Sequence, residues 1–140
     1  MRSQWSLIQS VAALRVLTLA PRFSPTVVRN MFVGVRSMVT LLNSRDVTRV
    51  LVAMARCHCV DTALLGSVMS RALAIAPSWQ DNDIAPAILA VAHLRVVCRP
   101  VVESLVRRLR TFPVGIQRRH APKVVEALLS VSRTSKHHVT

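Results

Sequence analysis

The fold is decided by the stretch at residues 46–82, DVTRVLVAMARCHCVDTALLGSVMSRALAIAPSWQDN. It aligns without a gap with residues 83–119, DIAPAILAVAHLRVVCRPVVESLVRRLRTFPVGIQRR. Residues 120–140 begin another copy at the same offset, and residues 9–45 fit the same frame on the N-terminal side. A fixed period of this length indicates a repeat protein. We therefore predict one helical-repeat domain over residues 1–140, with units 9–45, 46–82 and 83–119 and a partial unit 120–140.

Equivalent positions of the units carry apolar residues at helical spacing. Leu51 and its equivalents Ile88 and Val125 belong to the first half of the unit, and Leu105 belongs to a second stripe in the other half. Spacings of i, i+1, i+4 and i+7 place such residues on one helix face, so Leu51 and Leu105 are predicted core residues. The chain is predicted to be all-α, an α-solenoid of helix–turn–helix units with a 37-residue period. The expected helices are 6–20, 25–42, 46–58, 62–76, 83–96, 100–112 and 120–133.

Polar residues and prolines punctuate the units. Asp46 and Asp83 stand where the N-caps of first helices are expected. Pro86 and Pro122 are expected in the first turns of their helices, where proline is tolerated, and so is Pro100.

The charge of the chain points to a polyanionic partner. Nineteen basic residues face six acidic ones, a net charge of +13, and 17 of the 19 are arginine. A GC-rich coding bias would also favour arginine over lysine, but it would not remove the net charge. Such a field attracts nucleic acid first and an anionic membrane surface second. The longest stretch without a formal charge, residues 3–14, is too short to span a bilayer.

Clusters of cations form the candidate RNA-binding site. The densest set lies in unit 83–119 and the turn after it, and consists of Arg107, Arg108, Arg110, Arg118, Arg119 and Lys123. Stacked units would extend it as a basic stripe with Arg95, Arg99, Arg71, Arg36 and Arg29. Arginine suits this task because its planar fork grips phosphate in a bidentate way. The alternative is a solvated face that only keeps the protein soluble.

No catalytic, metal-binding or cofactor-binding motif is expected to act here. The spacing Cys57-His58-Cys59 is short of a second ligand pair, and Cys57 falls in an apolar column, which favours structural cysteines over a zinc site. Trp79 is expected to be a packing residue, although its place between two units would also let it touch a base.

The period and the apolar pattern, including VLVAMARC at 50–57 and AILAVAHL at 87–94, resemble heptatricopeptide-type repeats. These repeats are relatives of the octotricopeptide and FASTK/RAP-type helical repeats of organellar RNA-binding proteins. The resemblance implies binding to organellar RNA, and similar short proteins occur as mitochondrial ribosome subunits. No RAP-like domain follows the repeats in this sequence.

The N-terminal part of the sequence has the character of a mitochondrial targeting segment. Six arginines precede the first acidic residue, Asp46, with serines and apolar residues between them. We therefore expect a matrix protein that loses few N-terminal residues. The expected function is that of a structural subunit of a mitochondrial ribosome, in contact with rRNA and with neighbouring proteins of the particle. The alternative is a helical-repeat scaffold that binds an acidic protein partner in an organellar complex.

Overall fold

The computed structural model describes residues 32–57, 62–95 and 98–139, with Cys57 and residues 134–139 as backbone alone. These residues hold no strand, and a helical turn covers residues 32–36. The elements that follow are η2 (Val39–Leu41, a 3-10 turn), α3 (Ser44–Cys57), α4 (Thr62–Ala74), η3 (Ala76–Ser78, a 3-10 turn), α5 (Asp81–His93), α6 (Arg99–Leu109) and α7 (Val114–Val139). The prediction of an all-α chain is confirmed for this part, whereas the predicted helix at 6–20 lies outside it.

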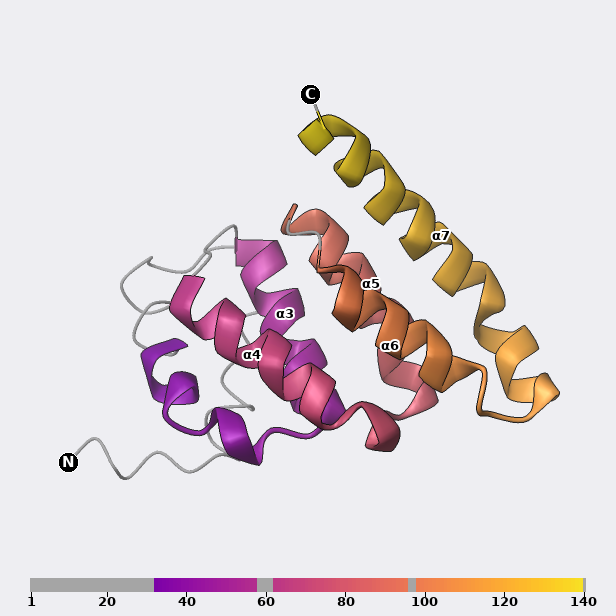
Figure 1. Cartoon of the computed structure of the whole chain (residues 1–140). Coiled ribbons are helices and arrows are strands. Elements are labelled where there is room, and N and C mark those ends of the chain that lie inside the picture. Colours follow the sequence, from indigo (N-terminus) through magenta and orange to yellow (C-terminus); the bar gives the residue numbers. More distant parts are fainter. Residues whose placement is uncertain (1–31, 58–61, 96–97, 140) are drawn as a thin grey trace.

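The helices form two layers. In the first layer α3, α5 and α7 lie side by side with α5 in the middle. In the second layer α4 packs on α3, and α6 packs on both α5 and α4. Figure 1 shows α7 at one edge, along α5 and on the side away from α3. The chain thus makes two successive helix hairpins, α3–α4 and α5–α6, before α7.

The core lies between the two layers and between adjacent helices of the first layer. Leu51 and Leu105 are 0% and 1% exposed, so the prediction that both are core residues is confirmed. One column of small residues is buried throughout, with Ala53, Ala90 and Ala127 no more than 3% exposed. Small side chains at these positions allow α3, α5 and α7 to approach one another closely.

The two hairpins have closely similar boundaries. The first residues of α3 and α5 are 37 positions apart, and so are the first residues of α4 and α6. The turns η2 and η3 are also 37 positions apart. Each turn precedes the first helix of a hairpin, so it sets the direction in which that helix begins.

Asp46 and Asp83 are not N-caps, contrary to the prediction. The backbone N–H of Asp46 donates to the side-chain oxygen of Asn43 over 2.9 Å, and the backbone N–H of Asn43 donates to the Asp46 carboxylate over 3.3 Å. This reciprocal pair is a capping box, in which the cap is Asn43. The N-cap of α5 is Gln80, and the carboxylate of Asp83 instead accepts a hydrogen bond from the hydroxyl of Ser44 in α3 over 2.9 Å.

Pro86 and Pro122 lie inside α5 and α7 rather than in their first turns, because both helices begin earlier than predicted. Both side chains are exposed. Water can therefore reach the carbonyl group that lacks its usual N–H partner where the proline nitrogen stands. Pro100 does lie in the first turn of α6, as predicted.

The helix α7 extends beyond the predicted 120–133 at both ends. The carbonyl oxygen of Pro113 accepts hydrogen bonds from the backbone N–H groups of Ile116 and Gln117, both over 3.0 Å, so the helix begins directly after this proline. The predicted helix 25–42 differs too, because residues 37–38 form a turn between the helical turn 32–36 and η2.

Candidate nucleic-acid interface

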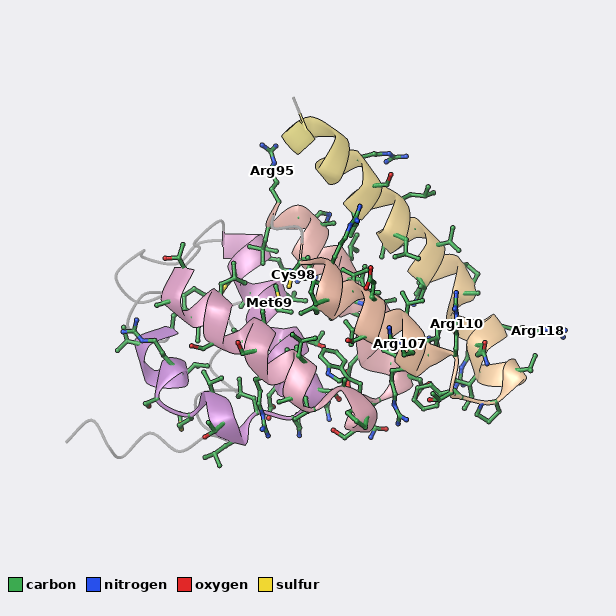
Figure 2. The ribbon with its side chains drawn as sticks, in the orientation of Figure 1. Met69, Arg95, Cys98, Arg107, Arg110 and Arg118 are labelled. Carbon is green, nitrogen blue, oxygen red and sulfur yellow. The ribbon has the colours of Figure 1, made fainter. Side chains whose placement is uncertain are left out.

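Exposed cations gather where α6 ends and α7 begins. We call this set the α6–α7 basic cluster, and it consists of Arg107, Arg110, Arg118, Arg119 and Lys123. Figure 2 shows Arg107, Arg110 and Arg118 at this end of the two helices, with Arg118 pointing outward from α7. Among the described residues, no carboxylate pairs with Arg107, Arg110, Arg118 or Lys123. Their charges are therefore open to an anionic partner.

The cluster follows from the local sequence of α6. This helix buries one apolar face, and Arg107 and Arg110, three residues apart, lie on the exposed side. Cations at a helix C-terminus are favoured because they face the negative end of the helix dipole. The side-chain amide of Gln117 donates to the carbonyl oxygens of Arg110 and Phe112, over 3.2 and 2.7 Å, and so fixes the connection to α7.

A carboxylate in α5 holds the start of α7. The Asp81 oxygen Oδ2 lies 2.7 Å from Nε2 of His120 and 3.4 Å from Nη2 of Arg119. The side chains of Asp81 and His120 are only 17% and 12% exposed, whereas that of Arg119 is 66% exposed. Arg119 can therefore present most of its guanidinium to solvent while it keeps this ion pair.

These contacts change the titration of Asp81. The hydrogen bond from His120 lowers the pKa of the Asp81 carboxyl below its ordinary value, and partial burial opposes this change only in part. A hydrogen bond from the backbone and the positive charges of His120 and Arg119 lower the pKa further. The carboxylate thus stays ionised at neutral pH, which is the state that binds both cations.

Arg108 has a structural task that sequence reasoning missed. Its Nε–H donates to the carbonyl oxygen of Trp79 over 3.0 Å, and Nη1 lies 3.3 Å from the hydroxyl of Thr111. The guanidinium also lies over the ring of Phe112, 4.5 Å from its centroid. Arg108 is half-buried, so it ties α6 to the turn before α5 and lies apart from the exposed cations of the cluster.

Arg71 makes the same bond in the preceding hairpin. Its Nε–H donates to the carbonyl oxygen of Leu42 over 2.9 Å, again 29 residues back in the chain. The predicted basic stripe therefore includes two arginines, Arg71 and Arg108, whose Nε–H groups are directed to backbone carbonyls. Their shared position in the units is a signal that sequence reasoning attributed to a surface charge.

The remaining predicted cations do not extend the cluster. Arg95, at the end of α5 with a φ of 58°, lies at the opposite end of the helices from Arg107, Arg110 and Arg118, as Figure 2 shows. Arg99 is exposed at the first residue of α6, the other end of that helix from the cluster. Arg36 is exposed in the turn 32–36, on the far side of α3 and α4 from α7, and Arg29 lies outside the described residues.

The other predicted candidates for chemistry are resolved only in part. Trp79 is fully buried and its indole N–H donates to the carbonyl oxygen of Ala72 over 3.1 Å, so the expectation of a packing residue is confirmed. Within the described ranges no group of three or more His, Cys, Asp or Glu residues could hold a metal ion. The motif Cys57-His58-Cys59 falls largely outside those ranges.

No protein-family model, no curated protein and no solved structure matches this chain. In the part of the chain that the structure describes, none of the helices is both long enough and apolar enough to cross a membrane.

Proposed function

We propose that this chain is an RNA-binding α-solenoid whose helix–turn–helix units repeat every 37 residues. The matching starts of α3 and α5 and of α4 and α6 support the period. The bonds from Arg71 to Leu42 and from Arg108 to Trp79 support it independently, because both partners of the second bond lie 37 residues after those of the first. In such an array each unit packs on its neighbours, which suits an extended binding surface.

The observation that carries the RNA proposal is the exposed α6–α7 basic cluster in a chain with a net charge of +13. Four of its five members have no carboxylate partner among the described residues. Phosphate groups of RNA would neutralise these charges and release counterions, which is the main source of affinity in backbone recognition.

The partner that fits best is a folded RNA held by its backbone. Sequence-specific reading of single strands depends on aromatic stacking, but the chain has only three Phe and two Trp, and Trp79 is buried. Recognition by shape and phosphate contacts remains. Together with the resemblance to organellar repeats and the arginine-rich start of the sequence, this favours a structural, rRNA-contacting subunit of a mitochondrial ribosome.

A protein scaffold in an organellar complex is the second candidate function. The observation that favours it is an exposed apolar face on α7, where Val125 and Leu129 are 54% and 53% exposed. A subunit of a ribonucleoprotein particle uses both kinds of surface, so the two functions are compatible.

Fluorescence anisotropy with a labelled RNA hairpin tests the RNA proposal. Between about 50 and about 200 mM salt, the logarithm of the affinity should fall with the logarithm of the salt concentration. For five phosphate contacts on a double helix the slope should be about −4.5. Polyglutamate is the competitor, because it carries the charge without the shape. Absence of salt-dependent RNA binding, together with tight binding of polyglutamate, would overturn the proposal in favour of the scaffold.

A further inference from the structure

The helix α7 presents an apolar face that no described element covers. Ala121, Val125 and Leu129 follow one another at intervals of four residues, so they lie along one side of the helix. We call these three residues the α7 apolar stripe. All three are exposed, with Val125 at 54% and Leu129 at 53%. The packed side of α7 is different, because Val124 and Ala127 are buried against α5.

The same positions are core in the helix next to it. Ile84, Ile88 and Ala92 of α5 lie 37 residues before Ala121, Val125 and Leu129, and they are 0%, 0% and 5% exposed. In α3 the equivalent Val47 and Leu51 are both fully buried. Neighbouring helices thus cover this face in α3 and in α5, but nothing covers it in α7, which lies at the edge of the first layer (Figure 1).

Two cations lie at the ends of the stripe. Arg118 precedes Val125 by seven residues and Arg133 follows Leu129 by four, so both lie close to the same side of α7. Both side chains are exposed, and neither pairs with a carboxylate of the described chain. The distance along the axis from Arg118 to Arg133 is about 22 Å, or roughly four turns.

We propose that the α7 apolar stripe binds an amphipathic helix of another protein, with acidic residues beside its own apolar face near both ends. A helix is the occupant because helices cover the equivalent face of α3 and α5. Acidic ends complement Arg118 and Arg133. A second copy of this chain is disfavoured, since two molecules that each carry a net charge of +13 repel. The proposal rests on the repeat arrangement and is independent of RNA binding.

Two synthetic peptides test this proposal on the full chain. Each is a helix of about 16 residues with a leucine stripe. One carries glutamates at both ends of the stripe and the other carries lysines at the same positions. The glutamate peptide should bind, and the lysine peptide should bind at least about tenfold more weakly, which corresponds to about 1.4 kcal/mol.

The double variant Val125→Ser/Leu129→Ser should weaken binding of the glutamate peptide by about tenfold or more. The matched control is Leu41→Ser in η2, since Leu41 is 62% exposed and lies in the segment farthest from α7 in Figure 1. Neither variant changes charge, so both should keep the RNA affinity and salt slope of the unmodified chain. That readout separates a failure of this proposal from a failure of RNA binding.

Several results would overturn the proposal. Equal affinity for the two peptides would exclude acidic complementarity, and unchanged binding by the serine double variant would exclude the stripe. Sedimentation equilibrium provides the third test. A dimer of the unmodified chain that Val125→Ser/Leu129→Ser abolishes would assign the stripe to a second copy instead.

Discussion

The Nε–H of Arg108 donates a hydrogen bond to the carbonyl oxygen of Trp79 over 3.0 Å, across 29 residues of the chain. Arg108 lies in the second helix of its hairpin, and Trp79 lies just before the first. The bond therefore closes the α5–α6 hairpin, as the bond from Arg71 to Leu42 closes the α3–α4 hairpin. Arginine suits this position because its rigid fork can direct Nε at the carbonyl while the other nitrogens bind elsewhere.

Replacing Arg108 by methionine should destabilise the protein by about 1–2 kcal/mol, because the carbonyl of Trp79 loses its partner while most of the packing volume remains. The control is Arg110→Met, which removes the same charge two residues away from an exposed position and should cost less than about 0.5 kcal/mol. Urea denaturation followed by circular dichroism measures both. Equal losses would show that the bond does not stabilise the hairpin.

One apolar column allows a sharper test of the packing. Leu51→Ala should cost about 3 kcal/mol because Leu51 is 0% exposed, and Leu51→Asp should abolish the fold. Val125→Ala in the equivalent position of α7 should cost less than about 0.5 kcal/mol, because Val125 is 54% exposed. Thermal unfolding compares the three variants. A large loss in Val125→Ala would mean that this face of α7 is covered in the isolated protein.

The contact of Asp81 with His120 should make stability depend on pH in the acid range. The folded pKa of Asp81 lies below its unfolded value, so its contribution is present above the unfolded pKa and is lost as the pH falls through the folded pKa. Each bound proton adds a slope of up to about 1.4 kcal/mol per pH unit. Asp81→Asn should reduce the slope between about pH 5 and about pH 2. An unchanged slope in urea denaturation would show that Asp81 makes no such contribution.

The helical class and the core were predictable because apolar residues recur at helical spacing and at one offset. Columns such as Ala53 and Ala90 need no knowledge of distant contacts. Helix starts were harder, because they depend on which polar group caps the backbone. Asn43 caps α3, and the sequence pattern alone favoured Asp46.

The basic site was predictable in composition but not in arrangement. Arg107 and Arg110 were expected on an exposed face, and they lie there. Arg108 differs from them only in its direction from the helix, and that direction decides whether it meets solvent or the carbonyl of Trp79. The link from Asp81 to His120 was missed because α5 was expected to begin at Asp83, which left Asp81 outside the helix.

The central claim is that the α6–α7 basic cluster binds the RNA backbone, and the salt dependence of RNA binding in two charge-matched variants tests it most directly. Arg107→Gln/Arg110→Gln removes two charges from the cluster. Arg99→Gln/Arg133→Gln removes two exposed charges from the opposite ends of α6 and α7.

The first variant should make the slope of log affinity against log salt shallower by about two, whatever the RNA sequence, whereas the second should leave the slope close to that of the unmodified chain. The same slope in both variants, whether unchanged or equally reduced, would contradict the account.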